Sequence, residues 1–75
     1  MNGLVKRSVT LAGHRTSIAL EAEFWAALAA CAEARRVPLA ALVAEIDAQR
    51  GSERGFERGL ASALRVFVLQ NFSRR

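Results

Sequence analysis

The fold is decided by residues 15–36, which read RTSIALEAEFWAALAACAEARR. In the first six of these residues, Ile18 and Leu20 alternate with the small side chains of Ser17 and Ala19. An alternation with a period of two residues gives a strand one apolar face and one polar face. The beginning of this stretch therefore predicts a β-strand, and the change of pattern after it marks where that strand ends.

A helix is predicted over about residues 21–36, because the apolar residues there recur at helical spacing. Alanine and glutamate fill most of the remaining positions and favour helix. The first turn holds Glu21 and Glu23 and the last holds Arg35 and Arg36, which is the charge order that the helix dipole prefers. The apolar stripe consists of Leu20, Phe24, Leu28, Cys31 and Ala32, with Trp25 and Ala29 beside it.

Upstream of this stretch the chain also alternates, with Val5, Val9 and Leu11 at odd positions. After Gly13 the alternation resumes at even positions, and a glycine at such a point indicates a bend. The pattern leaves two alternatives open, an interrupted strand that extends the ribbon or a short hairpin. No internal repeat is apparent along the chain.

Downstream, Val37 and Pro38 separate the first helix from a second one. The residue before a proline avoids helical conformation, and proline itself suits the first helical position. We therefore expect a second helix from Pro38 to about Gln49, with Gly51 as its cap. Its apolar stripe consists of Leu39, Leu42, Val43 and Ile46.

The rest of the chain divides into a loop and a third helix. Residues 51–59 contain three glycines and alternating charges, which predicts a loop. A strand over residues 65–69 is an alternative to the helix, because that segment is rich in β formers. The helical stripe consists of Leu60, Leu64, Phe67, Val68 and Phe72. The predicted organisation is a basic arm or extra strand over 1–14, a core over 15–50, the loop over 51–59, and a C-terminal helix with a basic tail over 60–75.

Length and composition restrict the class of protein. A chain of 75 residues is expected to form one domain. A domain of this size buries only about 60% of the surface that its unfolded form exposes. One cysteine and one histidine supply neither a disulfide nor a zinc site, so we expect no metal and no cofactor. Oligomerisation is then the remaining source of stability. Since 52% of the residues are apolar, disorder is not expected.

The charge pattern favours an acidic partner. The net charge is +4, both ends are basic and residues 21–49 are acidic. Arginine, which supplies nearly all of the cations, suits bidentate contacts with phosphate and guanine, so nucleic-acid binding is indicated. No stretch is apolar and long enough for a membrane span or a secretory signal, and a lone cysteine fits a reducing compartment. We expect a cytoplasmic protein without a membrane partner.

A single strand beside two helices has no partner in its own chain, and its backbone N–H and C=O groups are left unpaired. We therefore expect a two-fold homodimer in which the strand pairs antiparallel with its copy. Arg15, Ser17 and Ala19 would then point outward from the shared ribbon. The dimer core would consist of Ile18, Leu20, Phe24, Trp25, Leu28, Leu42, Val43 and Ile46.

These patterns bring the chain close to a known family. Residues 15–50 resemble the ribbon-helix-helix fold of DNA-binding repressors of the MetJ, Arc and CopG type. The residues that carry the resemblance are Arg15-Thr16-Ser17-Ile18-Ala19-Leu20, then Glu21, Phe24, Trp25, Leu28 and Ala32, and then Leu39, Leu42, Val43 and Ile46. The whole chain is similar to a bacterial subgroup of short ribbon-helix-helix proteins. The stretches similar to this subgroup are residues 6–17, 23–25, 44–47 and 62–69.

The resemblance implies a mostly α fold whose two-stranded ribbon enters the DNA major groove. Base edges would be read by Arg15, Ser17 and Ala19. Phosphates would be held by backbone N–H groups at the start of the second helix and by basic side chains. The implied phosphate contacts are Lys6, Arg7, His14, Arg35, Arg36, Leu39 and Ala40. Family members usually carry a glycine and then a serine or threonine at the turn into the second helix, whereas this chain has Arg36 and Pro38 there.

Two functions fit these features. The first is a homodimeric, sequence-specific transcriptional regulator, either a repressor or an antitoxin-like protein. The alternative is a dimeric adaptor that does not bind DNA and contacts a protein partner through its C-terminal helix, because a two-helix core does not need a third helix. No enzyme is expected, since no nucleophile has the base and the orienting group that it would need.

Overall fold

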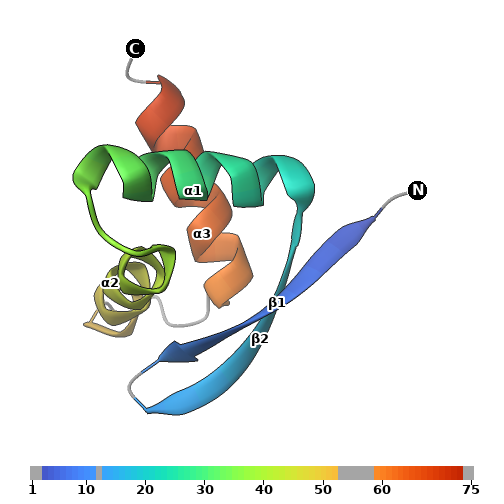
Figure 1. Ribbon diagram of the computed structural model, residues 1–75, viewed down its shortest axis with the longest axis vertical. Coiled ribbons are helices and arrows are strands. Elements are labelled where there is room, and N and C mark those ends of the chain that lie inside the picture. Colours follow the sequence, from blue (N-terminus) through green and yellow to red (C-terminus); the bar gives the residue numbers. More distant parts are fainter. Residues whose placement is uncertain (1–2, 12, 53–58, 74–75) are drawn as a thin grey trace.

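The computed structural model describes residues 3–11, 13–52 and 59–73. Within these residues a two-stranded antiparallel sheet precedes three helices (Figure 1). The succession of ribbon, two helices and C-terminal helix is therefore as predicted. The elements are β1 (Leu4–Leu11), β2 (His14–Glu21), α1 (Ala22–Arg35), α2 (Leu39–Ser52) and α3 (Leu60–Ser73).

Strand β1 pairs with β2 of the same chain, so the prediction that the strand lacks an intrachain partner is wrong. Of the two alternatives for the N-terminal residues, the hairpin is the one that forms. Leu11 lies opposite His14, and Gly13 between them has a φ of 83°, which glycine adopts without strain. The tight turn shifts the alternation from odd to even positions, and the apolar residues of both strands then face the same side.

Helix α1 follows β2 directly, because Glu21 still has an extended backbone (φ −62°, ψ 149°). The helix ends where Arg36 adopts the left-handed conformation (φ 60°, ψ 42°). The Arg36 N–H donates to the Glu33 carbonyl and the Val37 N–H donates to the Ala32 carbonyl, both at 3.0 Å. This pair of bonds is a Schellman motif, with arginine at the position where glycine is usual.

Helix α2 begins at Leu39, one residue later than predicted. The carbonyl oxygen of Pro38 accepts hydrogen bonds from the N–H groups of Ala41 and Leu42, at 3.0 and 3.2 Å. Pro38 therefore lies just outside the helix, and its carbonyl accepts the first bond of the helical ladder.

Helix α2 also ends later than predicted. It continues to Ser52, so an end near Gln49 with Gly51 as the cap is wrong. A glycine inside a helix costs about 1 kcal/mol, and the packing of the preceding turns offsets that cost. Of the predicted loop over 51–59, residues 53–58 lie outside the described residues, as do residues 74–75 of the basic tail.

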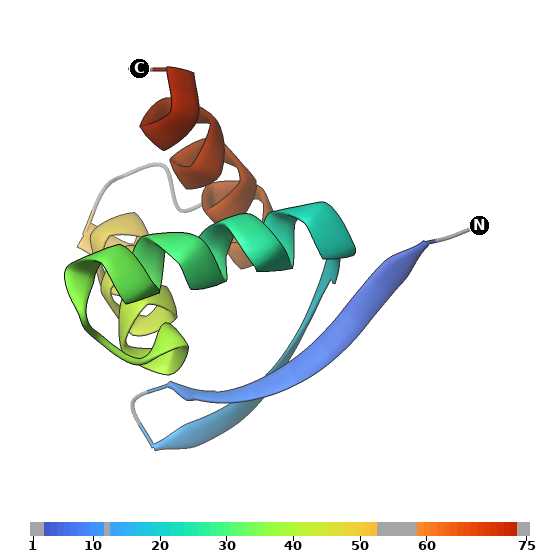
Figure 2. The ribbon, with the colours of Figure 1, turned by 45° about the horizontal axis from the view of Figure 1, so that its top comes forward.

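Residues 65–69 are part of helix α3, so the alternative prediction of a strand there is wrong. Leu64 and Val68, four residues apart, are buried, and Phe67 packs beside them. Burial of this helical stripe outweighs the β propensity of the segment. Helix α3 folds back and contacts α1, α2 and β2, and Figures 1 and 2 both show it behind α1.

The core lies between one face of the hairpin and the three helices (Figure 2). The side chains that we expected in a dimer core are buried within one chain, except for Phe24, which is half-buried. Their burial therefore does not require a second copy. The buried residues are Leu11, Ile18, Leu20, Trp25, Leu28, Ala32, Leu42, Val43, Ile46, Leu64 and Val68.

Candidate nucleic-acid interface

The hairpin face that is turned away from the helices carries mostly polar side chains from both strands. Residues directly opposite each other in an antiparallel pair lie on the same face of the sheet. Four cross-strand pairs lie on this face, of which Leu4–Glu21 stands at the end where α1 begins, and we call the six residues of the other three pairs the outer face. These three pairs are Lys6–Ala19, Ser8–Ser17 and Thr10–Arg15. All six side chains are exposed except that of Ala19, which is half-buried.

The orientation of β2 follows its alternation. Ile18 and Leu20 are buried against the helices, at 4% and 0% exposure. Arg15 and Ser17, at alternate positions, are exposed on the other side. A two-stranded ribbon has the width that the DNA major groove admits, so this face has both the shape and the hydrogen-bonding groups to read base edges.

Arg7 and His14 lie at positions of the opposite face. Arg7 is paired with Ile18 and His14 with Leu11. The guanidinium carbon of Arg7 lies 5.2 Å from the ring centroid of Trp25, within the range of a cation–π contact. Arg7 is therefore held in a contact within the chain, on the side of the helices.

Trp25 also fastens the hairpin to α1. Its indole Nε1–H donates to the backbone carbonyl of Val5 at 2.8 Å, and its side chain is 4% exposed. A buried indole needs a partner for its N–H, and the start of β1 supplies one. This bond sets the position of β1, and hence of half the outer face, relative to the helices.

The beginning of α2 presents free backbone donors. Pro38 has no N–H, and the Ala41 N–H already donates to the Pro38 carbonyl. Among the described residues no acceptor is recorded for the N–H groups of Leu39 and Ala40, as is usual for a first helical turn. Arg36 is exposed just before this turn, so a cation adjoins the donors that an anion would use.

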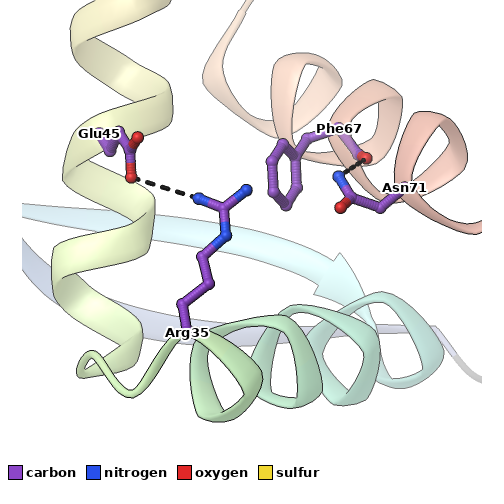
Figure 3. Close-up of polar contacts among 4 residues, drawn as sticks. All are labelled: Arg35, Glu45, Phe67 and Asn71. Carbon is purple, nitrogen blue, oxygen red and sulfur yellow. Dashed lines mark hydrogen bonds and ion pairs between the residues drawn. The ribbon is translucent and has the colours of Figure 1, made fainter.

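Arg35 lies between the other two helices (Figure 3). Its Nη1 donates to Oε1 of Glu45 on α2 at 3.4 Å, and its guanidinium carbon lies 5.3 Å from the ring centroid of Phe67 on α3. In the same cluster, Nδ2 of Asn71 donates to the Phe67 carbonyl at 2.9 Å. The ion pair is half-exposed and worth up to about 1 kcal/mol. A phosphate bound by Arg35 would compete with these contacts.

Arg65 of α3 makes a second contact between distant segments. Its Nη2 and Nε lie 2.9 and 3.0 Å from Oε1 of Glu21, at the junction of β2 and α1. Its guanidinium carbon is 5.7 Å from the ring centroid of Phe24. A hydrogen bond from its own backbone N–H, and then the contact with Arg65, hold the pKa of the Glu21 carboxyl below its ordinary value of 4.5.

The arrangement of ribbon and helices agrees with a known family. The sequence pattern of the ribbon-helix-helix domain matches residues 4–72. The chain belongs to the ribbon-helix-helix family. Ribbon-helix-helix domains are generally DNA-binding, act as dimers and are typically not enzymes. Searches of curated proteins and of solved structures find no match to this ribbon-helix-helix protein.

Two further observations concern the described part of this ribbon-helix-helix protein. None of the helices there is long and apolar enough to cross a membrane. The same residues contain no group of three or more histidine, cysteine, aspartate or glutamate side chains that could hold a metal ion.

Sequence reasoning placed the candidate base-reading residues on β2 alone, whereas the register places the exposed side chains of Ser8 and Thr10 of β1 on the same face. A signal for them exists, because residues 6–11 (KRSVTL) and residues 15–20 (RTSIAL) are similar at a spacing of nine. The two segments share one serine and one leucine at the same places, and two of the other four positions keep similar character, Lys6 with Arg15 and Val9 with Ile18. This similarity is confined to six residues of each strand and does not amount to an internal repeat of the chain.

Proposed function

We propose that this protein is a sequence-specific DNA-binding transcriptional regulator, a repressor or an antitoxin-like protein, whose β1–β2 ribbon enters the major groove. The observation that carries the proposal is the contrast between the two hairpin faces. One face packs on the helices, whereas the outer face keeps exposed serine, threonine, lysine and arginine side chains in register. Such side chains donate to and accept from base edges.

Base contacts are assigned to the β2 side chains first. Arg15 donates to O6 and N7 of guanine, a pair worth about 1–3 kcal/mol of discrimination. Ser17 donates or accepts, and Ala19 contacts a thymine methyl group. These three residues repeat the sequence-based assignment, and their outward positions on β2 support it.

Phosphate contacts are assigned to groups that hold no internal partner among the described residues. The free N–H groups of Leu39 and Ala40, with the side chain of Arg36, form an anion site at the start of α2. Lys6 and His14, both exposed, add positive charge or hydrogen bonds along the ribbon. Arg7 and Arg35 reach phosphate only by leaving Trp25 and the Glu45–Phe67 cluster, so we assign them a lesser role.

A homodimer is the proposed assembly, as is general in the family. The hairpin removes the need for a second copy to pair the strand, so the support comes from elsewhere. On α3, Leu69 and Phe72 are three residues apart on one helix face and are 61% and 46% exposed. Burial of such side chains between two copies would stabilise a dimer by about 25 cal/mol for each Å² of apolar surface.

The alternative function, a dimeric adaptor that does not bind DNA, loses the observation that supported it. It rested on a third helix that the core did not need, but Leu64 and Val68 of α3 are part of the core. The apolar stripe of α3 is therefore mostly used within the chain. DNA binding through the outer face remains the function that the geometry supports best.

The proposal is tested by binding to a mixed pool of duplex DNA at several salt concentrations. We expect a complex at micromolar protein in about 50 mM salt, with the logarithm of the binding constant falling by about 0.9 per phosphate contact for each tenfold rise in salt. Absence of any complex under these conditions would contradict DNA binding and return the adaptor function to first place.

A further inference from the structure

We propose that the hairpin of one protomer is by itself a complete and nearly two-fold symmetric reading ribbon, which recognises a nearly palindromic base sequence. The inference rests on the proposed function and deepens it, because it specifies the kind of DNA site. It assigns a base-reading role to β1, with Ser8 and Thr10 as reading residues and with Lys6 directed to a base edge in place of the phosphate role given above. The argument starts from the register of the hairpin.

The register contains an approximate two-fold axis. An axis normal to the sheet between Ser8 and Ser17 carries each residue of β1 onto the residue of β2 that lies nine positions later. Lys6 is thereby carried onto Arg15, and Thr10 onto Ala19. The pair Lys6–Ala19 is thus equivalent to the pair Thr10–Arg15, since both contain one cation opposite a small side chain.

The same axis relates the inner face. Val9 corresponds to Ile18 and Leu11 corresponds to Leu20, so apolar side chains occupy equivalent places on the two strands. Three of these four side chains are buried and Val9 is half-buried. Arg7 corresponds to Thr16 and Val5 to His14, and these side chains differ in character, so the inner face is only partly symmetric and the outer face carries the argument.

The approximate symmetry has a direct consequence for recognition. A ribbon made of one strand from each of two copies is symmetric because its strands are identical. Here two unlike strands of one chain reproduce that arrangement, with a cation at diagonal ends of the outer face and a serine pair at the centre. Two equivalent cations on a ribbon favour two equivalent guanines, one on each DNA strand.

The symmetry is broken at one pair of positions on the outer face. Threonine can exchange a hydrogen bond with a base, whereas alanine can only contact a thymine methyl group. The bases below Thr10 and below Ala19 should therefore differ. We expect the recognition sequence to be palindromic except at two bases, the one that faces Thr10 and the one that faces Ala19.

The test is selection of bound duplexes from a random library with the wild-type protein and with Lys6→Ala, Thr10→Ala and Arg15→Ala. The wild type should select a nearly palindromic element for each hairpin, so that the proposed dimer selects two copies of it, and the effects below refer to each copy. Lys6→Ala should lower the preference at one end by about tenfold and Arg15→Ala at the other end by a similar factor. Thr10→Ala makes the two strands alike at that position and should make the selected element more symmetric.

Ser62→Ala, a change at an exposed position of α3, is the matched control and should select the wild-type element. The near-ultraviolet circular dichroism of Trp25 reports whether each variant keeps its fold. Selection of one element by wild type, Lys6→Ala and Thr10→Ala alike would overturn the inference, because β1 would then not read bases. That result would leave the proposed function intact if Arg15→Ala still altered the element, whereas failure of the wild type to retain any duplex would overturn both.

Discussion

The indole Nε1–H of Trp25 donates to the backbone carbonyl oxygen of Val5 at 2.8 Å, and it does so across twenty residues of sequence. The bond joins α1 to the beginning of β1. Because Arg7, two residues after Val5, also lies over the indole ring, one side chain of α1 holds two alternate positions of the strand. Trp25 is therefore the residue that fixes the hairpin on the helices.

Trp25→Phe tests this role. Phenylalanine keeps an aromatic ring in the core but loses the N–H donor, so the Val5 carbonyl loses its hydrogen bond from α1. We expect a loss of about 1 kcal/mol in the free energy of unfolding. Hydrogen exchange of the β1 amides should accelerate more than that of α2 amides. Equal acceleration in both elements would contradict a local role for the bond.

Arg36→Gly is expected to stabilise the protein. A residue other than glycine in the left-handed conformation costs about 1–2 kcal/mol, and glycine removes that cost while adding some entropy to the unfolded chain. The net gain should be about 0.5–1 kcal/mol in urea unfolding. If Arg36 contacts phosphate as proposed, the same variant binds DNA more weakly although it is more stable. A variant that is both more stable and unchanged in DNA affinity would remove Arg36 from the interface.

Stability should fall at acid pH partly through Glu21. The pKa of its carboxyl is lowered in the folded protein relative to 4.5, so the ionised form is favoured by folding. This contribution is fully present above the unfolded pKa and is lost as the pH falls through the folded pKa. Urea unfolding between pH 6 and pH 3 should therefore be less sensitive to pH in Glu21→Gln. Glu33→Gln, at an exposed position of α1, is the control, and an equal change in both variants would exclude the backbone hydrogen bond of Glu21 and its contact with Arg65 as the cause.

Alanine substitutions at two leucines of α3 test whether one face of this helix is packed in the core while another face is exposed. Leu64 is fully buried, so Leu64→Ala leaves a cavity and should cost about 2–5 kcal/mol. Leu69 is 61% exposed, so Leu69→Ala should change the free energy of unfolding of the monomer by less than about 0.5 kcal/mol. Chemical denaturation of both variants at low protein concentration provides the measurement. Similar costs at the two positions would mean that α3 is not packed as described.

The sequence allows the elements to be predicted but not all of their partners. Alternation at Ile18 and Leu20 and the break before Pro38 are local signals, so the ribbon, the first two helices and the outward side of β2 follow from them. The turn at Gly13 pairs β2 with β1 and shifts the apolar positions from odd to even. The alternation of residues 4–11 and that of residues 14–21, each taken alone, do not reveal this pairing.

Contacts between distant segments were beyond the local pattern. Arg65 and Glu21 are 44 residues apart, and nothing near either residue specifies the other. The engagement of Arg35 with α2 and α3 likewise depends on how three helices pack. The similarity between residues 6–11 and residues 15–20, nine positions apart, was present in the sequence, but its meaning becomes clear only with the hairpin register.

The central claim is that the outer face of the hairpin contacts DNA, and Ser17→Glu compared with Ala30→Glu tests it most directly. Both positions are exposed and both changes lower the net charge by one, but Ala30 lies on α1, which covers the opposite face of the hairpin. A carboxylate at position 17 would face base acceptors and phosphates, so DNA affinity should fall by about tenfold or more, whereas the change at position 30 is screened and should cost less than about threefold. Equal losses of affinity in the two variants, with both proteins folded, would contradict the account.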